Sequence, residues 1–426
     1  MEQNLSSEAI TQKSRNEILE QMLKDAFNPR YNVVTGRVEI SKDNGLTFKP
    51  ISDREIKSFV RQMALKKFKT NIGEVSNILD SDFSSNYNPF EEYLDKLEWD
   101  GVTDHLQDFS RLLTVSNPDF LDMVLPKFIV GMVASVLDDK TTNEQMLVLT
   151  GGQGVGKTSF LNKLVPQQLL EYSHTGHLNI DNNDAAIKVS ETFLCNLDEM
   201  SSLNYRNIDK FKQLLSQKYI TGVRRPYARY SDNMRKYASF CGSSNNKEYL
   251  LDTTGNRRFL SLEVLSVDLE KLENFNIDGV YAQALSFYIN GDVKHWFNRD
   301  ETRIIEDNNA NFIYRSSEEE AILEVFKITD EKNDRRTATD IRQSLLDLGV
   351  INRNVDAQKI GRALTKLGFI SSKSNGRMLY NVAFVNDMKI NQSVKLSFLQ
   401  KRHPLPTLPS VFKRLENNNN TKKLDL

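Results

Sequence analysis

The first 115 residues combine two kinds of hydrophobic spacing. Apolar side chains recur at helical intervals in four segments and at strand intervals in one. The helical segments are residues 7–27, 53–68, 71–83 and 88–113, the last of them broken at Trp99-Asp100-Gly101. The extended segment 30–41 turns at Thr35-Gly36 and predicts a hairpin. This mixture predicts a small α+β domain over residues 1–115.

From residue 116 the pattern changes to short apolar runs that alternate with helical segments. A buried helix over 117–139 leads into an apolar strand and then into TGGQGVGKTSF, residues 150–160. Further strands are expected within residues 191–200, 237–246 and 257–264, and helices over 159–169 and 207–217. Alternation of this kind predicts a parallel sheet with helices on both faces. We expect an α/β domain over residues 116–315.

The segment 316–385 returns to helical spacing and ends in a two-strand signal. Its helices are expected over residues 316–328, 337–349 and 356–368. The strand pair 369–384 turns at Asn375-Gly376, a dipeptide typical of hairpins. Three helices and a wing predict a winged helix-turn-helix domain. Residues 386–426 lose periodicity and predict a flexible tail.

The composition indicates the cellular environment in which we expect the protein to work. The 56 Lys and Arg residues balance 57 Asp and Glu residues, which argues against a wholesale nucleic-acid coat but leaves local patches open. Cys195 and Cys241 give no disulfide framework. The polar N-terminus is no secretory signal, and the longest apolar run, 128–137, is too short to span a bilayer. We expect a cytoplasmic protein with no membrane partner.

The glycine-rich segment matches the pattern G-x-x-x-x-G-K-[ST], with a predicted strand before it and a helix after it. Its backbone N–H groups would face phosphates, Lys157 would reach the β- and γ-phosphates, and the Thr158 hydroxyl would bind Mg²⁺. A chance glycine turn is the alternative, but it would not explain these flanks. ATP and Mg²⁺ are the predicted cofactors. The predicted nucleotide contacts are Gly151, Gly152, Gln153, Gly154, Val155, Gly156, Lys157, Thr158 and Ser159.

The strand expected within residues 191–200 ends in two acidic residues. Asp198 would hold the metal through its water shell, and Glu199 would polarise the attacking water as general base. The alternative is a solvated acidic pair at a strand end. In a small-molecule kinase, a general base beside the magnesium-binding carboxylate would promote hydrolysis of ATP by water and so compete with transfer to the substrate. The pair therefore favours hydrolysis coupled to mechanical work.

Two further polar features follow within about a hundred residues. Asn245 ends a strand and is placed to sense the γ-phosphate, although Asn is also common in turns. Arg257 and Arg258 directly precede a strand, and one of them is a candidate arginine finger for the ATP of a neighbouring subunit. A surface ion pair is the alternative for these arginines. A finger in trans predicts a homo-oligomeric ring, which we expect to be a hexamer.

The motifs GGQGVGKT, FLCNLDEM, SFCGSSNN and GNRRF, with YNVVTGRVEI and YLDKLEWDG upstream, resemble the virulence-associated protein E family over residues 30–300. That family is related to superfamily 3 helicases. The resemblance implies a P-loop, AAA+-like ATPase that acts in replication of phages or chromosomal islands. Asn196 departs from the pattern because its strand position is usually apolar. The first 115 residues show no acidic triad or zinc-ligand set, so we expect no primase centre.

Two segments predict DNA contacts. Residues 218–236 carry six basic residues and one acidic residue, interleaved with tyrosines, in the interval that holds the pore hairpin of superfamily 3 enzymes. The predicted contacts to single-stranded DNA are Arg224, Arg225, Tyr227, Arg229 and Lys236. The alternative is that these arginines face a neighbouring subunit or a nucleotide phosphate.

Residues 332–377 carry ten basic and four acidic residues. The segment 356–368 is the expected recognition helix and would meet duplex DNA. The predicted contacts are Lys359, Arg362, Lys366 and, on the wing, Arg377. A winged helix that docks a protein is the alternative.

Three functions fit these features. The first is an ATP-hydrolysing DNA helicase or replication initiator of a mobile element, which moves along single-stranded DNA as a ring. The second is a DNA-binding switch that ATP controls without translocation. The third is a signalling or defence NTPase whose winged helix binds a protein.

Overall fold

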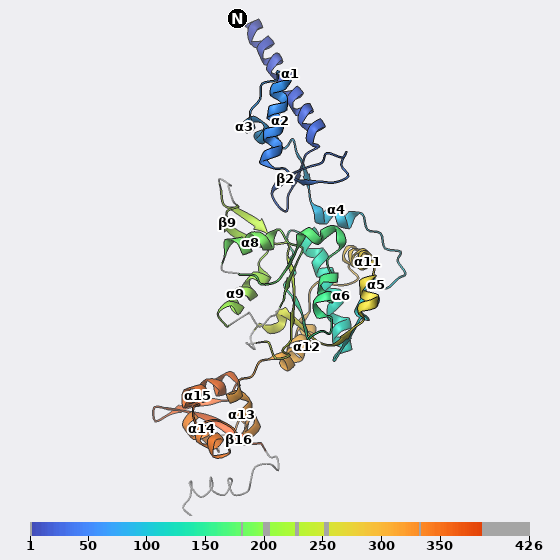
Figure 1. Ribbon diagram of the computed structural model, residues 1–426. Coiled ribbons are helices and arrows are strands. Elements are labelled where there is room, and N and C mark those ends of the chain that lie inside the picture. The colour runs from blue at the N-terminus through green and yellow to red at the C-terminus, as the bar shows by residue number, and fades with distance from the viewer. Residues whose placement is uncertain are drawn as a thin grey trace, which may run out of the picture. The chain divides into compact units, whose positions relative to one another are not determined.

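The computed structural model describes residues 2–179, 182–198, 205–225, 230–250, 255–331 and 334–385. The fold is mixed α/β with several sheets, and it divides into two compact units, Met1–Tyr314 and Arg315–Leu426 (Figure 1).

The N-terminal part of the first unit packs helices against a small sheet of order β3-β2-β1-β4. The helices are α1 (Glu2–Phe27), α2 (Asp53–Leu65) and α3 (Ile72–Leu79). The strands are β1 (Arg30–Asn32), β2 (Arg37–Ile40), β3 (Lys49–Pro50) and β4 (Ser85–Tyr87). The expected hairpin is confirmed as β1–β2, whereas the parallel pairing of β4 with β1 had no signal in the sequence.

A six-stranded sheet of order β5-β12-β6-β11-β8-β7 forms the centre of the first unit. All its pairings are parallel except that of β12 with β5. The strands are β5 (Leu113–Val115), β6 (Met146–Thr150), β7 (Ser173–Thr175), β8 (Leu194–Leu197), β11 (Ser239–Ser244) and β12 (Phe259–Val267). The expected parallel sheet is confirmed, and β5 and β7 are additions at its two edges.

Helices cover both faces of this sheet, which explains why its strands are apolar throughout. Along β6, Leu147 and Leu149 enter a core with α6 and α11, whereas Met146 and Val148 enter a second core with α8 and α9 (Figure 1). These helices are α6 (Pro118–Leu137), α8 (Asn183–Ser190), α9 (Tyr205–Ser216) and α11 (Ile277–Asn290). Shorter helices complete the layers: α4 (Pro89–Asp95), α5 (His105–Ser110), α7 (Lys157–Lys163), α10 (Leu269–Glu273) and α12 (Arg299–Asn309).

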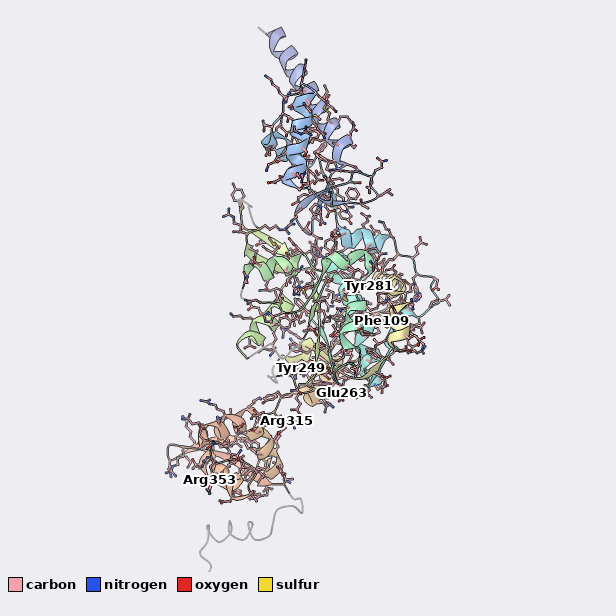
Figure 2. All side chains as sticks on the ribbon, viewed as in Figure 1. Phe109, Tyr249, Glu263, Tyr281, Arg315 and Arg353 are labelled. Carbon is pink, nitrogen blue, oxygen red and sulfur yellow. The ribbon has the colours of Figure 1, made fainter. Side chains whose placement is uncertain are left out.

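Helix α6 is apolar enough to cross a membrane by composition, but 72% of that window is buried inside the fold. Aromatic side chains fix its surroundings. The rings of Phe109 and Phe160 stack at 4.5 Å, and the Tyr281 hydroxyl donates to the Leu164 carbonyl at 2.6 Å (Figure 2). The hydrophobicity of α6 is therefore that of a central core helix.

The second unit packs three helices on a small sheet around a core that includes Ile322, Ile341 and Leu364. Its helices are α13 (Ser317–Val325), α14 (Ala338–Asp347) and α15 (Ala357–Lys366). Its strands are β13 (Phe326–Ile328), β14 (Arg335–Thr337), β15 (Ser371–Ser374) and β16 (Arg377–Phe384). The three helices and the β15–β16 hairpin are confirmed. The end of the first expected helix is instead β13, which pairs with β16.

The basic segment of the first unit forms a hairpin of β9 (Tyr219–Val223) and β10 (Asp232–Arg235). Lys236 follows β10 and is only 1% exposed. Its ammonium donates to the Leu215 carbonyl at 2.6 Å, near the end of α9. The predicted DNA contact of Lys236 is therefore wrong, because the side chain points into the fold and ties the hairpin to α9.

Burial lowers the pKa of Lys236 from 10.5 to about 7. Between about pH 7 and pH 10 the unfolded chain then binds more protons at this lysine than the folded chain does. The free energy of unfolding should therefore rise with pH through this range. In Lys236→Met this rise should be smaller, by up to about 1 kcal/mol per pH unit.

Urea unfolding at pH 7, 8 and 9 measures the effect. The exposed Lys24 on α1 provides the control, and Lys24→Met should follow the wild-type pH dependence. A Lys236→Met protein whose stability rises as steeply as that of the wild type would contradict the assignment.

Candidate nucleotide-binding site

The glycine-rich loop joins β6 to α7 over residues 151–156. Gly151, Gly154 and Gly156 have φ angles of 141°, 84° and 95°, which side chains rarely adopt. A Cβ atom on Gly151 would lie 2.4 Å from the Val264 carbonyl oxygen of the neighbouring strand β12. Glycine is therefore required by the backbone here, and residues 152–154 are left exposed.

Lys157 begins α7 and turns its ammonium back over the loop. Its side chain donates to the carbonyls of Gly151 at 2.8 Å and Gly152 at 2.7 Å, and to Asn245 Oδ1 at 3.1 Å. Burial lowers the pKa of Lys157, and the carboxylate of Asp198 opposes that shift. The structure thus brings together the predicted residues Lys157 and Asn245, which lie 88 residues apart in the chain.

Thr158, the residue after Lys157, meets Asp198. The Thr158 hydroxyl lies 3.4 Å from Asp198 Oδ1, and the Ser243 hydroxyl donates to the same oxygen at 2.9 Å. The topology explains this meeting. Strand β11 lies between β6 and β8 in a parallel sheet, so the carboxyl ends of all three strands share one edge. Ser243 was missed in the sequence because a serine at the end of an apolar strand carries no signal of its own.

Asn196 is the polar departure in β8, and the structure accounts for it. It is 2% exposed and donates from its side chain to Asn162 Oδ1 on α7 at 2.8 Å. A buried amide needs such a partner. Asn196 therefore links the acidic strand to the helix that follows the glycine-rich loop.

Three predicted residues of this region have other outcomes. Glu199 lies outside the described residues. Arg257 and Arg258 lie in a short 3-10 turn before β12, at the amino edge of the sheet, so they are on the opposite edge from Lys157. Arg257 is exposed, whereas Arg258 donates from Nε to the Ser216 hydroxyl at 3.0 Å.

Of the predicted hairpin contacts other than Lys236, the structure describes Arg225 and Arg224. Arg225 donates to the Val34 carbonyl at 2.9 Å and lies 3.7 Å from Glu191, so its guanidinium is engaged within the chain. Arg224 follows β9 directly. Tyr227 and Arg229 lie outside the described residues.

In the second unit the predicted DNA contacts separate into two groups. Lys359 and Arg362 are exposed on α15, and Arg377 is exposed on β16. Lys366 pairs with Glu319 of α13 at 2.9 Å and is 28% exposed. Lys359 lies 3.9 Å from Glu318 of the same helix, so both lysines turn toward α13, and their contact with DNA stays a prediction.

Comparison with known proteins gives one family match. Residues 94–314 match the virulence-associated protein E-like domain, which is more than half of the chain and ends where the first unit ends. No curated protein matches the chain.

Solved structures of "NrS-1 C terminal region" are among those that match the chain. One, of residues 305–718, has a TM-score of 0.47 and 11% identity, covering 87% of this chain and 98% of that chain. Another has a TM-score of 0.44 and 12% identity, covering 85% of this chain and 98% of that chain. The family assignment rests on the domain match and on the motifs above. The chain belongs to the virulence-associated protein E-like family.

Proposed function

We propose that this protein is a Mg²⁺-dependent ATPase that works as a DNA helicase or replication initiator of a mobile element. The observation that carries the proposal is the meeting of Lys157, Thr158, Asp198 and Asn245 at one edge of a parallel sheet. Crevices at the carboxyl ends of parallel strands are the usual ligand sites of such sheets.

The glycine-rich loop supports a triphosphate as the ligand. Its residues 152–154 are exposed, so their backbone can reach a ligand. The ammonium of Lys157 is held over the loop by hydrogen bonds to two loop carbonyls. An ammonium bonded only to neutral oxygens gains free energy when phosphate oxygens replace them, because hydrogen bonds between charged groups are stronger. Residues Gly151 to Ser159 are our proposed contacts between this loop and ATP.

The donor set also fits Mg²⁺. Thr158 and Asp198 offer a hydroxyl and a carboxylate 3.4 Å apart, and these are the hard oxygen ligands that Mg²⁺ prefers. Bound there, the metal would neutralise charge on the phosphates. Ser243 donates to Asp198 and holds the carboxylate toward Thr158.

The remaining residues suit hydrolysis. Asn245 donates nothing to Lys157 but accepts from it, which leaves its amide N–H₂ to hydrogen-bond a γ-phosphate or a water. Glu199 follows Asp198 in the chain and is our proposed general base. Arg257 or Arg258 is our proposed finger for a neighbouring copy in a homo-oligomeric ring, which we take to be hexameric.

DNA is the proposed partner of two surfaces. The β9–β10 hairpin would meet a single strand in the ring, with Arg224, Tyr227 and Arg229 as the remaining contacts. Helix α15 and the β15–β16 wing would meet duplex DNA through Lys359, Arg362 and Arg377, as in a winged helix.

One observation favours a second function, an ATP-controlled DNA-binding switch. Lys236 and Arg225 tie both ends of the hairpin into the body of the protein, through Leu215 and Val34. A hairpin attached at both ends fits a switch between two fixed positions as well as it fits repeated movement along DNA. Unwinding of a forked substrate separates the two functions.

Lys157→Ala should abolish ATP hydrolysis, with a loss of at least about a hundredfold, since phosphate positioning and charge stabilisation carry this chemistry. In the wild type, single-stranded DNA should raise the rate of hydrolysis. Steady-state phosphate release measures both effects. Hydrolysis by Lys157→Ala at the wild-type rate would refute the site. If hydrolysis depends on Lys157 but no forked DNA is unwound, the switch is the correct function.

Lys359→Ala with Arg362→Ala should weaken binding to duplex DNA and reduce the slope of log K against log salt by about 2. The control is Lys366→Ala, which should change the slope less, because its side chain is 28% exposed and 2.9 Å from Glu319, against 57% exposed and 3.9 Å from Glu318 for Lys359. Fluorescence anisotropy of a labelled duplex across a salt series measures both. An unchanged slope in the double variant would exclude α15 as the duplex contact.

A further inference from the structure

One side chain joins the N-terminal sheet to the β9–β10 hairpin. The guanidinium of Arg225, just after β9, donates from Nη2 to the Val34 carbonyl in the β1–β2 turn at 2.9 Å. Its Nη1 atom lies 3.7 Å from the carboxylate of Glu191, which directly follows α8. The turn packs so closely on Arg225 that a Cβ atom on Gly36 would lie 1.8 Å from Nη1. The N-terminal domain therefore holds a basic side chain that belongs to the hairpin.

The β1–β2 turn is fixed by its own hydrogen bonds. The side chain of Asn32 is buried, and its Oδ1 atom accepts from the backbone N–H groups of Val34 at 3.0 Å and Thr35 at 3.1 Å. Its amide group donates to Glu39 at 2.6 Å and to the Tyr172 hydroxyl at 2.8 Å. The Val34 carbonyl is thus presented from a rigid turn that is anchored to the central part of the first unit.

The contact with Arg225 leaves polar groups unsatisfied. The Nη1 atom of Arg225 and the hydroxyl of Thr35 are buried and have no hydrogen-bond partner among the described residues. Buried polar groups of this kind cost free energy. The Val34 carbonyl is also a neutral acceptor, whereas a phosphate is charged and can accept two bonds from one guanidinium. A phosphate would therefore be a better partner for Arg225 than the turn is.

Glu191 would keep opposite charge nearby if Arg225 moved away. Burial raises the pKa of Glu191, and the charges of Arg225, Arg37 and Lys188 each oppose that shift. Two of these three cations remain when Arg225 leaves. A buried carboxylate that loses every partner is strongly destabilising, but this one does not lose them all. The contact can open without that penalty.

We propose that the N-terminal domain restrains the hairpin through this contact of Arg225 with Val34 and Glu191, which we call the latch, and that Arg225 exchanges the latch for a phosphate of single-stranded DNA. The inference rests on the proposed function, which brings a single strand to the hairpin. While the latch is closed, the guanidinium is not available to the strand. Binding must therefore break a hydrogen bond to Val34, and the N-terminal domain lowers the affinity of the hairpin for DNA.

Gly36→Ala should open the latch and leave Arg225 in place. The added methyl group would overlap the flexible end of the Arg225 side chain, which can move away. The variant should bind a labelled oligothymidylate about fivefold more tightly than the wild type, because the bond to Val34 is already broken. The slope of log K against log salt should not change, since both proteins bind the strand with the latch open. Fluorescence anisotropy across a salt series measures both quantities.

A second set of variants tests whether the effect passes through Arg225. Arg225→Gln should reduce the salt slope by about 0.7, which corresponds to one phosphate contact on a single strand. In that background Gly36→Ala should leave the affinity unchanged. Glu191→Gln weakens the latch without straining a turn. It should tighten binding in the wild type and have no effect in Arg225→Gln.

Gly45→Ala is the matched control for backbone strain. Gly36 and Gly45 both have positive φ angles, 65° and 89°, in the N-terminal part of the first unit. A Cβ atom on Gly45 would make an ordinary contact of 3.5 Å with Asn28 and would not touch Arg225. This variant should bind the strand as the wild type does. Urea unfolding of every variant shows that it is folded.

Two results would overturn the latch and leave the proposed function standing. The first is binding by Gly36→Ala and Glu191→Gln that is no tighter than that of the wild type. The second is a gain in affinity that persists in the Arg225→Gln background, because it would not depend on the guanidinium. If the wild type binds no oligothymidylate even at low salt, the proposed DNA contact of the hairpin is wrong, and the latch is wrong with it.

Discussion

The order of strands in the central sheet is the constraint on which the rest of the first unit depends. Because β11 lies between β6 and β8, three loops from distant parts of the chain end at one edge. Lys157, Asn245 and Asp198 come from these three loops, and hydrogen bonds join them through 2.7–3.4 Å contacts that include Thr158 and Ser243. The same order puts Arg257 and Arg258 on the opposite edge, since they precede β12. One topology thus separates the glycine-rich loop from the arginines that we propose to act on a neighbouring copy.

Contacts outside the site connect it to the hairpin and the N-terminal sheet. Asn196 links β8 to α7, Lys236 links the base of the hairpin to the end of α9, and Arg258 reaches the same end of α9 through Ser216. The hairpin also meets the β1–β2 turn through Arg225 and Val34. A movement of α9 would therefore displace both the hairpin and the arginines. Under the proposed function, such connections would let the bound nucleotide change the position of the hairpin.

Local sequence patterns predicted the elements and the loop well, for physical reasons. Residues of β6 and β11 are buried on both faces, so they form apolar runs, and the glycines at 151 and 156 mark backbone angles that other residues resist. Charge patterns predicted contacts less well. Lys236, Arg225 and Lys366 belong to basic stretches, yet each is held inside its own unit by a carbonyl or a carboxylate from a distant segment. Only the tertiary structure shows that, and the same is true of Ser243.

The central claim is that the loop from Gly151 to Ser159, together with Asp198, holds ATP and Mg²⁺. Isothermal titration calorimetry of ATP, with Mg²⁺ and with EDTA, tests it most directly on the wild type and on Asp198→Asn. We predict one ATP per chain, tighter binding with Mg²⁺ than with EDTA, and loss of most of that metal dependence in Asp198→Asn. No binding of ATP by the wild type, or a metal dependence that Asp198→Asn leaves unchanged, would contradict it.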